Sequence, residues 1–272
     1  MKITKVLNNN AVIVLDEGEE KIAIGPGVGF SKGKNDIVPS RKVEKLFILK
    51  ENEQLSQLFE RIPEEHILIA EDIIRYAQSS LDTELGDHSR LGLTDHLSFA
   101  IERAIDGIIL KNKLLPEIRL LYKQEFEIGL WALKHVKEKL NIQLPIDEAA
   151  FLAIHIHTMK IRGGDIKKTV RQTGIIRDMV GTIEKHLNIK IEEDEISYER
   201  LITHLRFALI RVEQGRRETM DEEMFELIKD KFPEAYNCSL QVIERLKQKH
   251  KISMPKDELG FITLHIERLR TL

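Results

Sequence analysis

Cysteine, long apolar runs and charge of one sign are all scarce in this chain of 272 residues. Cys238 is the only cysteine, so the chain cannot form an internal disulfide, which suits a reducing compartment. No uncharged apolar run is long enough to span a bilayer, and Lys2 and Lys5 are not followed by the apolar stretch of a signal peptide. Acidic residues exceed Lys and Arg by only three. We therefore expect a cytoplasmic protein without membrane insertion, in which the whole chain has no strong attraction for a polyanion.

The first 50 residues differ from the remainder in charge and in pattern. They hold nine basic and six acidic residues, a net charge of +3, whereas the remainder sums to −6. Their apolar residues fall in short, often β-branched runs separated by residues 8–10, 16–18 and 25–29, and Val43 to Leu49 adds one more run. This pattern predicts four short antiparallel strands. Because so small a sheet buries little surface, we expect this head (residues 1–55) to dimerise through a shared core.

The head contains residue types that bind RNA. Asparagine amides can bond base edges, lysine neutralises phosphate, glycine allows close backbone approach, and phenylalanine stacks on an unpaired base. The residues concerned are Lys5, Asn8, Asn10, Gly25, Gly27 and Phe30, with Lys32 and Lys34 beside them. A structural explanation stays open, because Asn and Gly also form ordinary hairpin turns and Phe30 could belong to the core.

The rest of the chain consists of two copies of one helical repeat. The segment from Asp147 to His157 returns 110 positions later, and the segment from His96 to Arg103 returns 108 positions later. Apolar residues recur at helical spacing in both copies, and a copy of about 100 residues is long enough to form its own hydrophobic core. The predicted fold class is therefore multidomain α+β, with a small antiparallel β-sheet head followed by two homologous all-α helical bundles.

The repeat and the breaks in pattern predict the domain limits. We place the domains at 1–55, 64–168 and 172–272, with a polar linker over 51–63. Helices are expected from Ile67 to Ala77, over 94–109 and within Tyr122 to Leu140. Acidic residues open the next helix, as they do in a first turn, and Gly163 and Gly164 end it.

Four histidines recur at equivalent places on these apolar helices: His96 and His155 in the first copy, His204 and His265 in the second. Each ring could be a core histidine bonded to a backbone carbonyl, a metal ligand, an acid–base catalyst or a phosphate acceptor. Recurrence in both copies lowers the weight of the first interpretation, since duplication alone need not keep a polar ring on an apolar face.

Metal binding and catalysis are the weaker interpretations. His155 and His157 point to nearly opposite sides of a helix, and we find no carboxylate or thiolate repeated beside the histidines: the Asp before His96 is replaced by Thr before His204. Nothing resembles a nucleophile or an oxyanion hole. We therefore expect no metal, no cofactor and no catalytic residue.

Phosphate acceptance fits the histidines better. A neutral imidazole is available as a nucleophile near pH 7. Phosphorylation would add negative charge to an apolar helix interface, where it can disrupt packing or recruit arginine. Arg103, Arg211 and Arg268 lie on the same helices. Two histidines that face each other across a helix pair would form a bistable switch.

Several segments along the chain share the motifs of one protein family. They are Met1 to Asn10, Gly25 to Phe30, Lys34 to Val38 and Leu93 to Ile101, together with the other histidine segments. With these motifs the chain resembles the BglG/SacY family of transcriptional antiterminators over essentially its whole length. Residues 25–27 and 130–132 are most similar to sucrose-responsive members.

The resemblance implies a co-antiterminator (CAT) RNA-binding domain that dimerises, followed by two regulation domains (PRDs) of the sugar phosphotransferase system (PTS). Such proteins bind a hairpin in a leader mRNA and so prevent the overlapping terminator from forming. A sugar-specific enzyme II phosphorylates the first regulation domain and inactivates the protein, and HPr phosphorylates the second. By resemblance, the RNA contacts fall on Lys5, Asn8, Asn10, Gly25, Gly27 and Phe30, and the phosphorylated residues are His96, His155, His204 and His265.

Two other classes of function stay open. The chain could be a PTS-phosphorylated protein-interaction regulator whose head only dimerises, or a histidine-using enzyme or phosphocarrier. RNA binding by the chain distinguishes the first of these from an antiterminator. Phosphohistidine formation from phosphoenolpyruvate, enzyme I and HPr tests the assignment of the switch.

Overall fold

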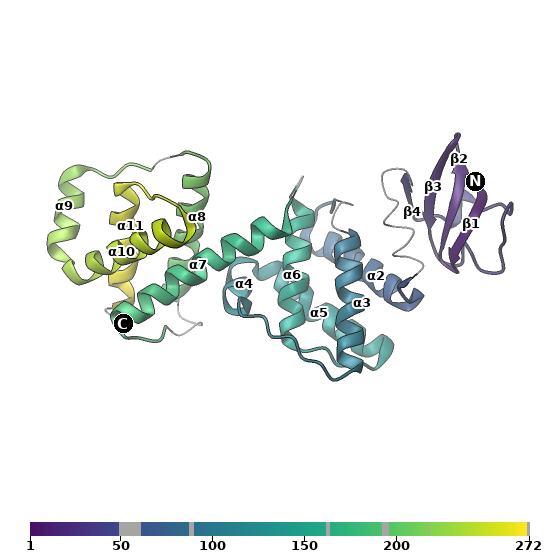
Figure 1. The fold of residues 1–272 in the computed structure, drawn as a ribbon, viewed down its shortest axis with the longest axis horizontal. Helices are drawn as coiled ribbons and strands as arrows, with labels where there is room; N and C mark the ends of the chain where they lie inside the picture. The colour runs from purple at the N-terminus through teal and green to yellow at the C-terminus, as the bar shows by residue number, and fades with distance from the viewer. Residues whose placement is uncertain (49–60, 87–89, 162–163, 192–195, 217, 271–272) are drawn as a thin grey trace. The chain divides into compact units, whose positions relative to one another are not determined.

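The computed structural model describes residues 1–48, 61–86, 90–161, 164–191, 196–216 and 218–270 (Figure 1). The chain divides into two compact units, one of Met1–Leu110 with Ile128–Gly163 and the other of Lys111–Glu127 with Gly164–Leu272. Most of the predicted linker over 51–63, the strand end at Leu49 and the helix end at Gly163 lie outside the described residues. Within the described part of the chain, no helix is long and apolar enough to cross a membrane.

The head is a four-stranded antiparallel sheet, as predicted. Its strands are β1 (Lys2–Asn8), β2 (Ala11–Asp16), β3 (Glu19–Ile24) and β4 (Lys45–Ile48), in the order β1-β2-β3-β4. A short 3-10 turn, η1 (Ser40–Lys42), precedes β4. Glu17 and Gly18 both have positive φ, at 52° and 85°, which is the conformation that joins tightly paired strands such as β2 and β3.

Both faces of this sheet are apolar. Alternate side chains of a strand point to opposite faces, and apolar residues occupy both sets of positions. One face packs against the loop after β3, and its buried residues are Ile3, Val12, Val14, Ala23, Val28 and Val38. The other face packs against Ile62 and Ile67, within the same compact unit, and its strand residues are Ala11, Ile13, Ile22 and Ile24. The head therefore has one core of its own, and its second apolar face packs against Ile62 and the first turn of α2.

The first helical bundle contains α2 (Glu64–Leu81), α3 (Arg90–Ile105), most of α5 (Lys123–Leu140) and α6 (Ile146–Lys160). Its core is a single cluster drawn from all four helices. The helix predicted over 94–109 begins and ends four residues earlier. Gly107 has a φ of +70°, and a residue in this left-handed conformation commonly ends a helix.

The second bundle repeats this plan. Its helices are α7 (Ile166–Leu187), α8 (Ile196–Glu213), α9 (Glu222–Lys231), α10 (Pro233–Arg245) with the π turn η4 (Leu246–His250), and α11 (Lys256–Arg270). The bounds of α11 equal those of α6 plus 110. In both helices an Asp–Glu pair lies in the first turn, as predicted, and this places one buried glutamate of each pair at the start of the histidine-bearing helix.

A segment that the repeat assigns to the first copy packs in the second unit. α4 (Leu115–Leu121) lies against α7 and α8. The Glu117 carboxylate is fully buried and accepts from Arg177 at 3.0 Å, and the Tyr122 hydroxyl lies 3.4 Å from that of Thr173. The packing of the helices thus does not follow the limits of the two sequence repeats.

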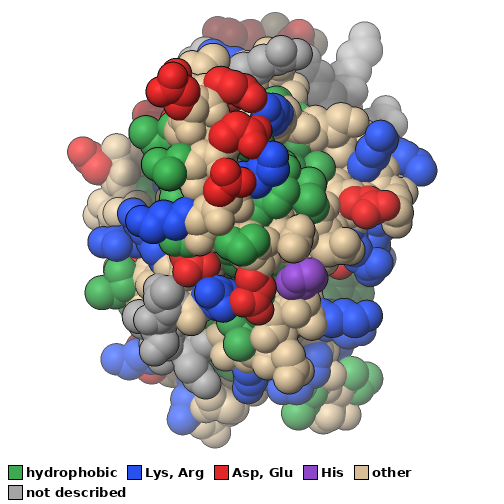
Figure 2. Space-filling model, turned by 90° about the vertical axis from the view of Figure 1, so that its left-hand side faces the viewer, with side chains coloured by type: hydrophobic (Ala, Val, Ile, Leu, Met, Phe, Trp, Pro, Cys, Tyr) green, Lys and Arg blue, Asp and Glu red, His purple; other side chains and the backbone are tan. Residues whose placement is uncertain are grey.

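On the face drawn in Figure 2, acidic and basic side chains are interspersed with hydrophobic ones.

Candidate functional site

The first histidine pair lies where α3 packs on α6. His96 is on α3 and His155 is on α6, and their ring centroids are 5.2 Å apart with the planes tilted by 35°. Phe151, one turn before His155, also contacts the His96 ring, with centroids 5.3 Å apart. Two segments that are about 60 residues apart in the chain therefore bring the two predicted imidazoles together.

A buried carboxylate holds this pair. Glu148 is 2% exposed, one of its oxygens lies 2.9 Å from Nε2 of His96, and the other accepts from Arg103 at 2.8 Å. Burial raises the pKa of Glu148, but the hydrogen bonds from His96 and Arg103 outweigh this and the net pKa is lowered. Because an ionised carboxylate can only accept, Nε2 of His96 carries the hydrogen of this bond.

His155 is a neutral ring. Burial, and then the charge of His96, lower the pKa of His155 to about 3, so the imidazole carries no charge at pH 7. Its Nδ1 is buried, and the described residues offer it no hydrogen-bond partner. Buried polar atoms without a partner are uncommon in native proteins and call for an explanation. One nitrogen of this ring is therefore uncommitted.

The second pair repeats the arrangement on α8 and α11. The rings of His204 and His265 are stacked, with centroids 4.4 Å apart and planes 29° apart, and Phe261 lies 5.9 Å from His204. Burial lowers the pKa of His204. Burial, followed by the charges of His204 and two arginines, lowers the pKa of His265 to about 4. Both rings are thus predominantly neutral near pH 7.

The second carboxylate makes a different set of bonds. Glu258 is 1% exposed and accepts from Arg211 through both oxygens, at 2.7 and 2.8 Å. Nε2 of His204 lies 3.8 Å from Glu258, beyond hydrogen-bond distance, and within the described chain this buried atom has no partner. The same three residue types therefore occur in two bonding states, one in each bundle.

The expectation that no carboxylate is repeated beside the histidines is wrong. Glu148 and Glu258 are 110 positions apart and each lies beside the first histidine of its copy. The repeat contained this signal, but we interpreted both residues only as first-turn acids. As for a metal, the described residues contain no group of three or more His, Cys, Asp or Glu placed to hold one, and an arginine is bonded to each carboxylate.

Most of the predicted RNA-binding residues meet at one end of the head sheet. The side chain of Asn8 accepts from the backbone N–H of Asn10 at 2.9 Å, and Gly25 donates to the backbone oxygen of Asn10 at 3.0 Å. The N–H of Gly27 donates to the side chain of Asn10, and Phe30 donates to the backbone of Gly27 at 3.3 Å. The β1–β2 turn and the loop after β3 thus form one connected surface.

Exposure differs among these residues. Phe30 is 65% exposed, so it is not part of the core, and Lys5, Lys32 and Lys34 are also exposed. Asn10 is 4% exposed, and its side-chain nitrogen donates to Glu64 at 2.6 Å. In this conformation the Asn10 amide orients the loop and is not free to bond a base.

Comparison with known proteins covers the whole chain. The model of the CAT RNA binding domain matches residues 1–56, and the model of the PRD domain matches residues 71–159 and 177–269. The chain is 36% identical over 275 residues to the transcription antiterminator LicT of Bacillus subtilis (strain 168), with 99% of each chain covered. The chain belongs to the BglG/SacY family of transcriptional antiterminators.

Two further relatives extend the comparison. The chain is 36% identical to the beta-glucoside operon antiterminator of Dickeya chrysanthemi, which covers all of this chain and 97% of that protein. The crystal structure of GlcT CAT-PRDI matches with 34% identity and a TM-score of 0.54, over 59% of this chain and 98% of that one. The four histidines lie within the two PRD matches, and the six predicted RNA-binding residues lie within the CAT match.

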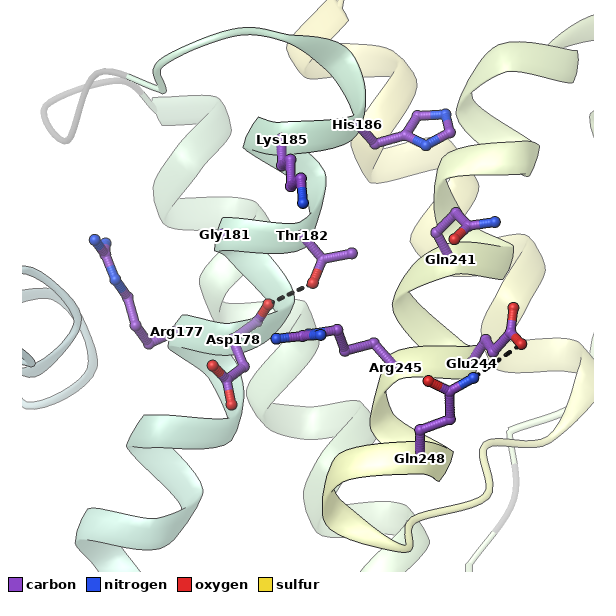
Figure 3. Close-up of a pocket in the computed structure, with 10 residues that line it drawn as sticks. All are labelled: Arg177, Asp178, Gly181, Thr182, Lys185, His186, Gln241, Glu244, Arg245 and Gln248. Atoms are coloured by element: carbon purple, nitrogen blue, oxygen red, sulfur yellow. Dashed lines mark hydrogen bonds between the residues drawn. The ribbon is translucent and has the colours of Figure 1, made fainter.

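A cavity in the second PRD lies apart from this chemistry. Figure 3 shows it between α7 and α10, with Asp178, Lys185 and Arg245 among the residues that line it. None of the four histidines lines the cavity. Lys249 and His250 bond to Asp178 at 2.5 and 2.7 Å. These contacts hold η4 against α7, which is a structural role.

Proposed function

We propose that this antiterminator binds a hairpin in a leader mRNA as a homodimer, and that phosphorylation of His96, His155, His204 and His265 controls it. The phosphoryl donors are HPr and a sugar-specific enzyme II of the phosphotransferase system. The observation that carries the proposal is the recurrence of a histidine pair, with ring centroids 5.2 and 4.4 Å apart, in the two PRDs of one chain.

The chemistry of the two pairs supports phosphoryl acceptance. Burial keeps His155 and His265 neutral, with pKa values of about 3 and 4, so each ring has a nitrogen lone pair at physiological pH. Each pair also has an arginine within the same cluster, at Arg103 or Arg211. Guanidinium groups are well suited to pairing with a phosphoryl group.

The head supports RNA binding by its surface chemistry. Phe30 offers an exposed ring for stacking, and exposed lysines lie on β1 and after β3. Hydrogen bonds through the backbone and side chain of Asn10 fix the position of the loop that carries the ring. Base reading by the Asn10 amide itself requires its release from Glu64.

Exposed apolar side chains of the head support dimerisation. Leu15, Ile37 and Leu46 are 44%, 68% and 42% exposed, although a small sheet has little apolar surface to spare. A second copy of the head could cover them. This contact would complete the twofold RNA-binding surface that the family resemblance implies.

A gel shift with the full chain tests the RNA-binding claim. The probe is the leader hairpin upstream of a sugar operon, in low salt because salt weakens phosphate contacts. Phe30→Ala should weaken binding by roughly 5-fold to 150-fold, since one base–aromatic stack contributes about 1–3 kcal/mol. Phe207→Ala, which removes another exposed ring on α8, should bind as the wild type does.

The outcomes distinguish the antiterminator from a protein-interaction regulator whose head only dimerises. If the wild-type chain gives no shift at micromolar concentration, the head serves only to dimerise and the chain is a protein-interaction regulator. If Phe30→Ala and Phe207→Ala lower affinity equally, the stacking role of Phe30 is refuted. An unchanged thermal melt of Phe30→Ala excludes loss of fold as the cause.

A further inference from the structure

Each histidine pair adjoins a carboxylate–arginine pair, and the phosphorylation proposal uses the arginine but gives the carboxylate no role. Glu148 bonds His96 and Arg103, and Glu258 bonds Arg211 beside His204. Both carboxylates are almost fully buried. The arrangement occurs in two bundles that share only part of their sequence, so the histidine, the carboxylate and the arginine recur as one group.

Buried charges of this kind are unfavourable unless something offsets them. The arginine offsets the carboxylate while the histidine is neutral. A phosphoryl group on the histidine brings between one and two further negative charges to the same place. At about 4 Å, the repulsion between like charges near a protein surface exceeds the free energy of a tenfold change in equilibrium. The carboxylate and the phosphoryl group therefore compete for one guanidinium.

We propose that Glu148 and Glu258 are positioning residues that hold Arg103 and Arg211 in reserve, and that phosphorylation of the adjacent histidine moves each arginine from the carboxylate to the phosphoryl group. This proposal rests on the proposed function. The carboxylate acts through the arginine and does not contact the phosphoryl donor. It sets how readily the phosphorylated state forms, and its release changes the contact between α3 and α6 or between α8 and α11.

The transfer step requires no further reactant. The lone pair of an unprotonated imidazole nitrogen of His204 attacks the phosphorus of phosphohistidine in HPr. The new N–P bond forms as the donor N–P bond breaks, and the donor nitrogen keeps that electron pair. The ring of His204 gives up its N–H proton to solvent, and the imidazole of HPr takes one up, so the charge balances. Nothing is oxidised or reduced. In the second PRD, Nε2 of His204 has no hydrogen bond to break first, because Arg211 occupies both oxygens of Glu258.

The test measures phosphorylation at equilibrium in the full chain. Phosphoenolpyruvate, enzyme I and HPr are added, and the ratio of phosphorylated to free His204 is read by mass spectrometry at neutral to alkaline pH against the same ratio in HPr. Glu258→Gln should raise the ratio about tenfold, because it removes the repelling charge and takes from Arg211 its bidentate partner, leaving only the pair with Glu218 at 3.0 Å. Arg211→Gln should lower it about tenfold. Glu258→Asp, which keeps the charge, should stay near the wild type.

A matched control comes from the same unit. Glu117 and Arg177 form another buried carboxylate–arginine pair, on α4 and α7, which carry none of the four histidines. Glu117→Gln should leave the His204 ratio unchanged even if it lowers the melting temperature. Opposite signs for Glu258→Gln and Arg211→Gln, with no change in the control, establish the exchange of the arginine.

Two results would overturn the account at different levels. If Glu258→Gln and Arg211→Gln lower the ratio together, the pair is structural and the positioning role is refuted, while phosphorylation itself stands. If neither His204 nor His265 is phosphorylated in the wild-type chain, the proposed function fails for the second PRD. Labelling of the wild type together with equal ratios in every variant also refutes the positioning role.

Discussion

Lowering the pH should destabilise the first PRD through His155. The ring is half-buried beside His96 and its pKa is about 3, whereas an unfolded histidine titrates near 6.5. Between these values the unfolded chain binds the extra proton, so the free energy of unfolding is highest above about pH 6.5 and falls as the pH drops toward 3. From pH 7 to pH 5 the unfolding equilibrium constant should rise by a factor of about 25, which lowers the free energy of unfolding by about 2 kcal/mol.

The assay can use the single tryptophan of the chain. Trp131 lies on α5 in the first bundle and stacks on Tyr76, with centroids 3.8 Å apart, so its fluorescence reports unfolding of this bundle. Urea titrations at pH 7, 6 and 5 should give a wild-type chain that loses about 2 kcal/mol more than His155→Gln does.

A control with the same chemistry is available in the other bundle. His265→Gln removes a ring whose pKa is also lowered by burial but whose unfolding Trp131 does not report, and it should keep the wild-type pH dependence of the tryptophan signal. If His155→Gln loses as much stability as the wild type between pH 7 and pH 5, the inference that His155 is buried as a neutral ring is refuted.

Three further predictions concern stability and reactivity. Arg103→Met leaves the buried Glu148 without its cation and should cost roughly 3–5 kcal/mol in urea titrations, most of which should return when Glu148 is also changed to Met. Burial raises the pKa of Cys238 to about 12, so iodoacetamide at pH 8 should alkylate the urea-unfolded chain and spare the native one, as read by mass spectrometry; equal labelling would contradict the burial. Gly129→Ala should lower the melting temperature, because its Cβ would collide with the backbone of α6. Gly174→Ala on α7 meets open space and should stabilise by up to about 1 kcal/mol; the opposite order of the two melts would refute this.

Much of the fold follows from local pattern. Short apolar runs broken by Asn and Gly predicted the four strands, because strand period and turn chemistry are local properties. The offset of 110 residues predicted that α6 and α11 would be equivalent, and their bounds agree. Both ends of α3 lie four residues earlier than predicted, since helix limits depend on weak local signals, such as the conformation of Gly107 just after the C-terminal end.

The parts that sequence reasoning missed depend on long-range contacts. Glu148 meets Arg103 and His96 across more than 40 residues, and the first-turn position of the glutamate gave a sufficient local explanation. The packing of α4 in the second unit likewise depends on Glu117 and Arg177, 60 positions apart. The exposure of Phe30 excludes the core position that residue type alone had left open, and its contact with RNA stays a prediction.

The resemblance to sucrose-responsive members stays a prediction. It rests on residues 25–27 and 130–132, and the relatives that match over the whole chain include a beta-glucoside operon antiterminator. In the proposed function, the sugar is set by the enzyme II that phosphorylates the first PRD. A sugar permease encoded beside this chain would identify the sugar and the leader RNA together.

Mapping of phosphohistidine on the full chain is the most direct test of the central claim. Phosphoenolpyruvate, enzyme I and HPr are added to the wild type and to a variant in which His96, His155, His204 and His265 are all alanine. The account predicts label in the wild type at His204 or His265, and none in the variant. Label that survives in the variant, or that falls on other histidines of the wild type, would contradict the claim that the paired imidazoles are the switch.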